Sequence, residues 1–302
     1  MPHRPTPLDW LILIVLVAVW GASFAMSKHA IAHLDASWVM ALRLAVAALV
    51  LVPYALLSGA GITASAAAWG KYAWLALIGY AVPFFIITWG MYFVTSGVAG
   101  LLMASIPLFL VVLAHFTLAD ERLNLPKSIG FLLGFFGIIV LIGPEAVFTF
   151  SLSGDELKGE LAILLGCLCY AVHGVSAKRL GFDHPVKQSA AVCLLAALMG
   201  LAFAVVYRPD GLSNVPLSGY MAVVGLGLFP TAIATLLAYR LMARAGPSFV
   251  SYSNYLVPIF AVLLGAVLLH EKLGWNILGA LVLVLSGIAI SRITPRRKDL
   301  IS

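Results

Sequence analysis

Few residues of this 302-residue chain carry groups that could do chemistry, and they stand out because their surroundings are apolar. Lys28 closes the stretch VWGASFAMSK, and Lys178 closes a looser version, CYAVHGVSAK, further along the chain. Arg43 lies inside another apolar segment, and His173 lies within the second stretch. A guanidinium or ammonium group can bind an anion, and an imidazole can move a proton. These residue types indicate binding or proton transfer.

Catalytic signatures are absent from the sequence. It contains no GxSxG nucleophile motif, no HExxH zinc motif and no paired aspartates within an apolar segment. An intramembrane protease or acyltransferase is therefore disfavoured. We expect no enzymatic activity, no cofactor and no metal.

Aromatic and polar residues in the apolar segments are the candidates for contacting a solute. Trp20 and Tyr80 lie well inside their segments, where a ring with a polar edge suits a moderately apolar solute. The run SFVSYSNY at 248–255 is the most polar stretch in any such segment. The predicted substrate-binding residues are Trp20, Phe24, Tyr80, Phe84, His173, Ser251, Tyr252 and Asn254.

Four prolines lie near the centres of apolar segments: Pro83, Pro107, Pro230 and Pro258. A proline in a helix lacks an N–H and frees the carbonyl four residues earlier. In lipid that carbonyl needs another partner or a wet cavity. The prolines are predicted gating hinges, with static kinks as the alternative.

The three basic residues in these segments each leave alternatives open. Arg43 is about 10 Å inside its segment and should face protein or water. It could bind a substrate carboxylate, extend to the outer interface or donate to loop carbonyls. Lys28 and Lys178 could anchor helix ends at the interface, or attract substrate or gate each mouth.

The composition fixes the kind of element that must position these residues. The chain is 63% hydrophobic and 10% charged, with a mean hydropathy of +1.07, whereas soluble domains carry about 25% charged residues. We expect an all-α polytopic membrane protein. About 20 apolar residues cross a bilayer. Ten such spans can be drawn: 8–32, 36–57, 71–93, 96–117, 127–143, 159–179, 186–207, 217–240, 247–269 and 274–292.

The net charge of +6 indicates orientation in the membrane and no nucleic-acid partner, because Lys and Arg collect on the cytoplasmic side. With a cytoplasmic N-terminus, thirteen basic residues lie inside: Arg4, Lys71, Arg122, Lys127, Lys178, Arg179, Lys187, Arg240, Arg244, Arg292, Arg296, Arg297 and Lys298. Four lie outside: Lys28, Lys158, Arg208 and Lys272. Both termini are predicted to be cytoplasmic, and the first span is read as a retained helix.

The chain repeats itself at a nearly constant offset. Lys28 and Lys178, ERL at 121–123 and EKL at 271–273, and Gly137 and Gly287 are each 150 residues apart. The predicted repeats are 8–145 and 159–293. Each holds five helices, and because five is odd, the second repeat is inverted in the membrane. Inverted repeats are typical of secondary transporters with a mid-bilayer site between the halves.

The spans hold almost no carboxylates, whereas proton-coupled pumps usually carry an intramembrane Asp, Glu or His. Only His115 and His173 could serve. A facilitator is therefore at least as well supported as a proton antiporter, and His173 either lines the pathway or only packs.

With these residues in view, the chain resembles the drug/metabolite transporter superfamily, in its ten-helix EamA-like branch. The resemblance rests on WGASFAMSK, the proline in the fourth span and the ERL and EKL turns. Within that branch the chain looks like bacterial inner-membrane exporters of aromatic and other neutral amino acids. This implies ten helices around a central cavity, and export from cytoplasm to periplasm by a monomer.

Other functions stay open at this point. An exchanger of phosphorylated or nucleotide-linked metabolites would need several basic residues in the cavity, and only Arg43 is available. A channel or a lipid scramblase is a further alternative, because an inverted repeat does not exclude either.

Overall fold

The computed structural model describes residues 5–62, 65–117, 125–142, 154–181, 184–208, 211–250 and 252–291. Within these ranges every regular element is a helix, which confirms the predicted all-α polytopic class. The α-helices are α1 (Pro7–Ile31), α2 (Ala36–Leu57), α3 (Ala66–Ala76), α4 (Val82–Gly90), α5 (Ser96–Leu102), α6 (Ile106–Thr117), α7 (Leu125–Ile142), α9 (Asp155–Leu180), α10 (Pro185–Tyr207), α11 (Leu217–Leu226), α12 (Ala234–Ala245), α13 (Pro247–Val250), α14 (Ser253–Leu268) and α15 (Trp275–Ser291).

Seven helical stretches in the described ranges are long and apolar enough to cross a membrane. They are Pro7–Ile31, Ala36–Leu57, Ala66–Gly90, Ser96–Thr117, Asp155–Leu180, Pro185–Tyr207 and Leu217–Ala245. Three shorter apolar helices, Ser128–Leu141, Ser253–Leu268 and Trp275–Ile290, lie at the predicted fifth, ninth and tenth spans. Helix α14, with 16 residues, covers about 24 Å and is shorter than the predicted span 247–269, because the separate short helix α13 comes before it.

Local sequence sets where the helices begin and end. Thr6 and Asp9 form a reciprocal capping box at the start of α1, with a proline in the first turn. The Asp35 carboxylate accepts from the Ser37 N–H and caps α2. Gly181 and Gly246 end α9 and α12 with φ of 81° and 85°, a left-handed conformation that favours glycine.

Two of the long helices contain a π-helical segment. Segment η1 (Leu77–Ala81) joins α3 to α4, and η3 (Gly227–Ile233) joins α11 to α12. Pro83 follows η1, and Pro230 lies inside η3. A shorter 3₁₀ segment, η2 (Met103–Ser105), joins α5 to α6 just before Pro107. Such departures from α-helix are common at functional sites.

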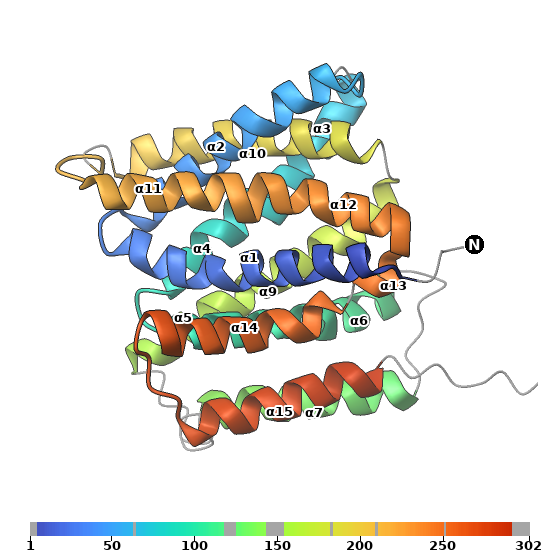
Figure 1. Ribbon diagram of the computed structural model, residues 1–302, viewed down its shortest axis with the longest axis vertical. Helices are drawn as coiled ribbons and strands as arrows, with labels where there is room; N and C mark the ends of the chain where they lie inside the picture. The colour runs from blue at the N-terminus through green and yellow to red at the C-terminus, as the bar shows by residue number, and fades with distance from the viewer. Residues whose placement is uncertain are drawn as a thin grey trace, which may run out of the picture.

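Helices that correspond in the two predicted repeats pack against each other. Helix α2 packs on α10, and α7 packs on α15. Figure 1 shows the α7–α15 pair at one edge of the bundle. Its backbones are close: a Cβ added to Gly287 would lie 2.5 Å from the Gly130 carbonyl oxygen and 2.8 Å from the Gly134 nitrogen. Small residues permit this close approach in lipid.

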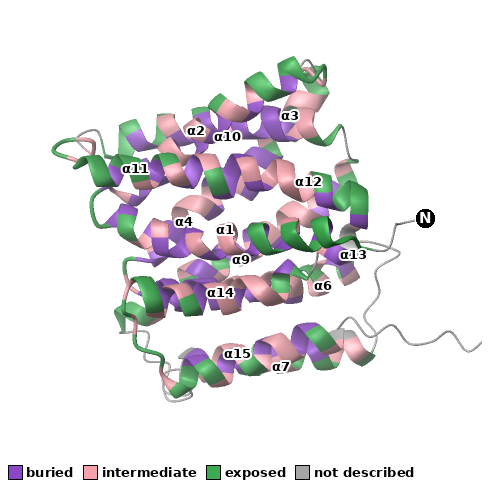
Figure 2. Cartoon of the chain, in the orientation of Figure 1, coloured by how far each residue is buried: buried purple, intermediate pink, exposed green. Residues whose placement is uncertain are grey.

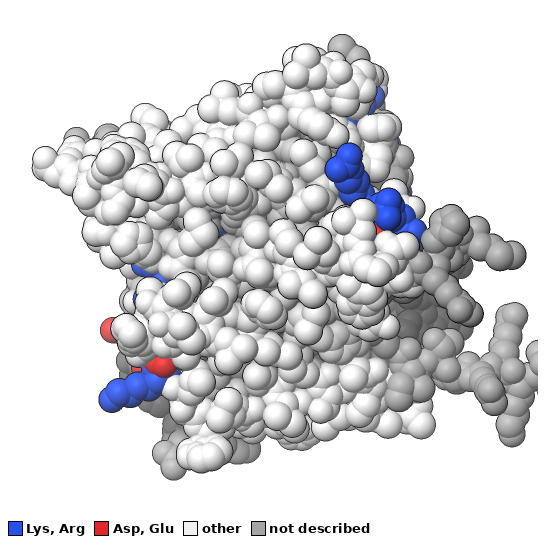
Figure 3. All heavy atoms as spheres, in the orientation of Figure 1, with Lys and Arg blue, Asp and Glu red and all other residues white. Residues whose placement is uncertain are grey.

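The burial pattern suits an apolar solvent outside the bundle. Buried positions lie where helices face one another, and exposed positions lie on outward faces and at helix ends (Figure 2). Leu57 and Trp275 are 89% and 88% exposed. On the face drawn in Figure 3, Lys, Arg, Asp and Glu of the described residues gather toward the two ends of the helices. The apolar band between them is the surface that a bilayer would cover.

Candidate functional site

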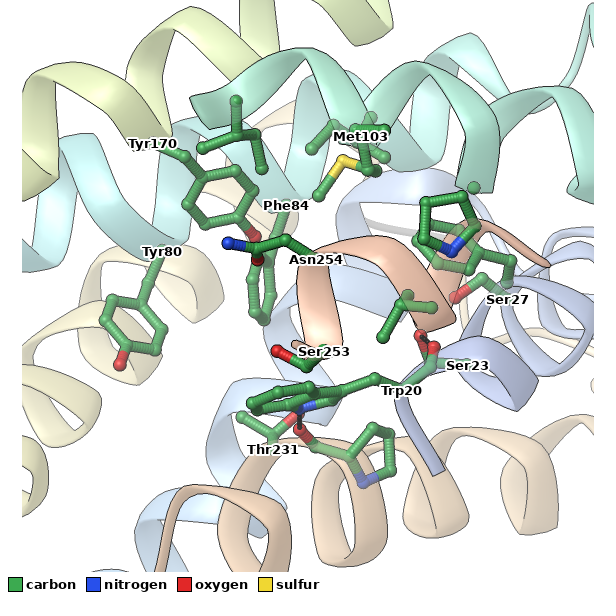
Figure 4. Close-up of a pocket in the computed structure, with 18 of the residues that line it drawn as sticks. Trp20, Ser23, Ser27, Tyr80, Phe84, Met103, Tyr170, Thr231, Ser253 and Asn254 are labelled. Carbon is green, nitrogen blue, oxygen red and sulfur yellow. Dashed lines mark hydrogen bonds between the residues drawn. The ribbon is translucent and has the colours of Figure 1, made fainter. Parts of the chain in front are cut away.

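A cavity of about 510 Å³ lies between the two halves of the chain. Its lining residues come from α1, α2, η1, α4, α5 and α6 in the first half, and from α9, η3, α12 and α14 in the second. Figure 4 shows labelled side chains from both halves around this space. The cavity is therefore built jointly by the two halves.

An aromatic wall forms one side of the cavity. The ring centroids of Tyr80 and Phe84 are 5.7 Å apart, and those of Phe84 and Tyr170 are 6.3 Å apart. The His173 ring meets the Tyr80 ring edge-on at 6.0 Å. Tilted and edge-on pairs of this kind are the favoured aromatic arrangements. The wall can hold an apolar or aromatic part of a solute.

Trp20 connects this cavity to the π-helical segment η3. Its indole Nε1 donates a hydrogen bond to the Pro230 carbonyl oxygen at 3.2 Å. The Ser23 hydroxyl, one turn later on α1, donates to the Trp20 carbonyl at 2.6 Å. Trp20 thus joins the first helix of one half to the interrupted helix of the other (Figure 4).

Arg43 lies on the cavity wall beside the same segment. Its Nε donates to the Thr231 hydroxyl at 2.8 Å, and its guanidinium carbon lies 4.3 Å from the Phe84 ring centroid. The Thr231 hydroxyl in turn donates to the Leu226 carbonyl at 2.8 Å. That carbonyl is the one predicted to be freed by Pro230, so the structure gives it a partner. Arg43 neither extends to the interface nor binds loop carbonyls here.

His173, in the second half, contacts the interrupted helix of the first half in the same way that Trp20 contacts η3. Its Nδ1 lies 3.2 Å from the Leu75 carbonyl oxygen, two residues before η1. Because a carbonyl only accepts, Nδ1 is the donor in this contact. Gly79 makes room for this ring, since a Cβ there would overlap Nδ1 of His173. His173 therefore joins α9 to the interrupted helix of the first half.

Most of the predicted residues lie at this cavity. Those that line it are Trp20, Phe24, Arg43, Tyr80, Phe84, Pro107, His173, Pro230, Asn254 and Pro258. Their contact with a substrate and the hinge role of the prolines remain predictions. Ser251 lies outside the described residues.

Two predicted residues do not line the cavity. Tyr252 is 48% exposed and stacks on Trp10 with ring centroids 6.2 Å apart. It lies in the break between α13 and α14, which turns its ring outward, so its assignment to the substrate site is corrected. Pro83 is buried and faces α9, where a Cβ on Gly166 would lie 3.6 Å from the Pro83 carbonyl oxygen.

Lys28 is not in the cavity either, because it caps a neighbouring helix. Its Nζ donates to the Met91 carbonyl at 2.5 Å and to the Val94 carbonyl at 2.8 Å, just after α4 ends. The Glu271 carboxylate accepts from the Ser96 and Gly97 N–H groups at 2.7 and 3.0 Å, where α5 begins. The turn between α4 and α5 is thus held by a lysine on one side and a glutamate on the other.

A second polar contact lies toward the opposite ends of these helices. The Arg244 Nε donates to the Asp9 carboxylate at 2.7 Å and joins the end of α12 to the start of α1. The Asp9 side chain is 3% exposed and that of Arg244 is 45% exposed. Lys178, predicted to act at this mouth, is exposed and does not line the cavity.

Several lining residues were not predicted from the sequence. Tyr170 occupies the place in CYAVHGVSAK that Trp20 occupies in VWGASFAMSK, 150 residues earlier, and this correspondence could have identified it as a lining residue. Thr231 directly follows Pro230 in the sequence, so its place near the Leu226 carbonyl that Pro230 frees could also have been predicted. Ser253 belongs to the polar run at 248–255 already identified from the sequence, whereas Ser27 and Thr88 were not indicated as lining residues. The described residues contain no group of three or more His, Cys, Asp or Glu placed to hold a metal ion.

Comparison with known proteins places this arrangement among membrane transporters. The model of the EamA-like transporter family matches the chain twice, at residues 8–143 and 157–293. The uncharacterized transporter YoaV of Bacillus subtilis is 27% identical over 215 residues, covering 70% of this chain and 72% of YoaV. The uncharacterized inner membrane transporter YedA of Escherichia coli is 32% identical over 195 residues, covering 63% of this chain and 60% of YedA.

A solved crystal structure with a similar fold is among the structures that match this chain. It aligns with a TM-score of 0.69 at 21% sequence identity, covering 96% of this chain and 98% of the other. An uncharacterized transporter of Archaeoglobus fulgidus is 24% identical over 286 residues, covering 93% of this chain and 97% of the relative. The helical arrangement is thus common to most of this chain and most of the solved structure.

Proposed function

The chain belongs to the EamA-like transporter family, whose members carry small solutes across membranes, and from this premise we propose that it exports amino acids or related small metabolites. The observation that best supports this proposal is the cavity of about 510 Å³ that the two halves share. This volume is within the range of about 300–1,000 Å³ that is usual for small-molecule sites. Its aromatic wall suits aromatic and other neutral amino acids.

We propose that the solute moves by alternating access. The third span of each half is interrupted, by η1 in one and η3 in the other, and each interruption contacts the first helix of the opposite half through Trp20 or His173. Bending at η1 or η3 would therefore move helices of both halves at the same time. Rocking of one repeat against the other around a fixed site is the general scheme for transporters of this plan.

We further propose that the protein is a facilitator. The cavity lining among the described residues includes no Asp and no Glu, the groups that usually carry protons in coupled transporters. His173 is the one histidine among the described lining residues, and histidine is a common proton carrier. If transport proves to be proton-coupled, His173 is the residue to examine.

The competing transport function is less well supported. An exchanger of phosphorylated or nucleotide-linked metabolites would bring two or more negative charges into the cavity. Arg43 is the sole Lys or Arg among the described lining residues. A channel or scramblase is not favoured by any feature of the site, and neither is an intramembrane enzyme.

The proposed setting is the bacterial inner membrane, with both termini in the cytoplasm and the monomer as the working unit. A relative from Escherichia coli is named as an inner membrane transporter. The excess of basic residues at one set of helix ends supports the orientation.

The test is transport in liposomes reconstituted with purified protein. Uptake of labelled phenylalanine, threonine and a quaternary ammonium cation is measured with and without a pH gradient. We expect both amino acids to equilibrate across the membrane without a pH gradient, and the quaternary cation to stay out. No transport of any amino acid would overturn the proposed function. A strict need for a proton gradient would overturn the facilitator mechanism alone.

A further inference from the structure

We propose that Arg43 binds a carboxylate of the transported solute, so that the cavity selects monocarboxylates with an apolar remainder. The inference rests on the proposed function, because it assigns the substrate class of the same cavity. One observation supports it. The guanidinium of Arg43 lies on the cavity wall within the membrane and has no carboxylate partner among the described residues.

The charge of Arg43 is uncompensated. Other basic residues of the chain meet carboxylates: Arg244 pairs with Asp9, Arg208 with Asp35 and Lys158 with Asp155. The titratable groups close enough to Arg43 to interact electrostatically are Tyr170 and Cys193, and neither is a carboxylic acid. Arg43 is half-buried on the cavity wall, and a cation held at membrane depth without a counter-ion is costly. A solute that brings an anion into the cavity would remove that cost.

The guanidinium is also held in one orientation. Its Nε donates to the Thr231 hydroxyl, whose own proton goes to the Leu226 carbonyl, so Thr231 can only accept from Arg43. The Phe84 ring supports the guanidinium 4.3 Å from the ring centroid. No described residue accepts a hydrogen bond from the two terminal nitrogens of Arg43. This leaves a pair of N–H donors free for the two oxygens of a carboxylate.

The surroundings narrow the solute class further. One guanidinium balances one negative charge, which suits a carboxylate better than a phosphate ester. Next to Arg43 lies Phe84, which contacts Tyr80 and Tyr170, so the remainder of the solute meets aromatic rings. An amine without a carboxylate would be repelled by Arg43 and would bring no anion to offset that repulsion. A zwitterion is admitted, because the faces of the aromatic rings can receive its ammonium group.

The test compares three solutes that share a phenyl ring in reconstituted liposomes. Phenylalanine carries a carboxylate and an ammonium group, 3-phenylpropionate only the carboxylate and phenylethylamine only the ammonium. We expect the wild type to move the two carboxylates at least tenfold faster than phenylethylamine. In Arg43→Gln this preference should be lost, with the two carboxylates slowed at least tenfold. Arg240→Gln, which changes an exposed arginine on α12, is the matched control and should keep the preference.

Two further measurements keep the test decisive if Arg43→Gln does not fold. Thr231→Val removes the group that orients Arg43 and should reduce the preference for carboxylates, whereas Arg43→Lys should retain part of it. In detergent, 3-phenylpropionate should raise the thermal unfolding midpoint of the wild type, and phenylethylamine should not.

The outcomes separate this inference from the proposed function. If the wild type moves no amino acid, the proposed function fails. If it moves phenylalanine but moves phenylethylamine equally fast, or if Arg43→Gln keeps the preference, the carboxylate assignment is wrong and the exporter function stands.

Discussion

The indole Nε1 of Trp20 and the carbonyl oxygen of Pro230 are joined by a 3.2 Å hydrogen bond across 210 positions of sequence. The bond reaches a carbonyl inside η3, the interrupted helix of the other half. His173 makes the reciprocal contact with the Leu75 carbonyl before η1. In each half, one ring N–H thus donates to the interrupted helix of the other half.

The first prediction concerns this bond. Trp20→Phe keeps an aromatic ring in the cavity but removes the donor, and a neutral hydrogen bond contributes about 0.5–1.5 kcal/mol. We expect amino-acid transport to slow by about twofold to tenfold, with expression unchanged. The initial rate of amino-acid uptake into reconstituted liposomes is the measurement that checks this prediction. Trp275→Phe, at an 88% exposed position, should have no effect, and an unchanged rate in Trp20→Phe would make Trp20 a packing residue.

The second prediction tests the space that Gly79 leaves for His173. Gly79→Ala places a methyl group on the His173 ring, and overpacking of this kind costs about 1–3 kcal/mol. We expect a lower unfolding midpoint and impaired transport. Gly70→Ala is the matched control, because a Cβ on Gly70 meets nothing within 4 Å. That variant should be neutral or slightly stabilising, since alanine favours helix by about 1 kcal/mol.

The third prediction concerns the turn between α4 and α5. Lys28→Met removes the ammonium that donates to the Met91 and Val94 carbonyls. Hydrogen bonds to a charged group contribute about 1.5–3 kcal/mol, so we expect a loss of that order in the free energy of unfolding in detergent. Lys272→Met, at an exposed position, should change little. Equal stability of the two variants would show that Lys28 is only an interfacial anchor.

The fourth prediction compares a partly buried ion pair with an exposed one. Asp9→Asn weakens the link to Arg244 and leaves an arginine without its carboxylate, so the midpoint of thermal unfolding should fall. Asp155→Asn weakens a pair whose side chains are 71% and 53% exposed, and such pairs contribute little. The expected result is a clear shift for the first variant only. Similar shifts in both would contradict it.

The positions of the helices could be predicted from the sequence because lipid imposes a length on apolar segments. The spans predicted at 36–57 and 96–117 begin and end where the helical stretches do. The third span starts earlier than predicted, at Ala66, because Ser65 caps the helix and Lys71 is accommodated within it. Hydropathy alone places the start too late, since it does not detect a cap.

The site could be predicted only in part. Aromatic residues deep in a span identified Trp20, Tyr80 and Phe84, which do line the cavity. The partners of Arg43 and Lys28 could not be predicted, because Thr231 and Met91 are brought to them by packing between distant helices. Tyr252 was misplaced because polarity along a sequence does not say which way a residue in a helix break points.

The pairing of α7 with α15 and of α2 with α10 has a consequence for a chain that is divided into its two halves. An interface between counterpart helices is one that two copies of a single half could form with each other. Two fragments that each hold one half of the chain would thus carry complementary surfaces on these four helices.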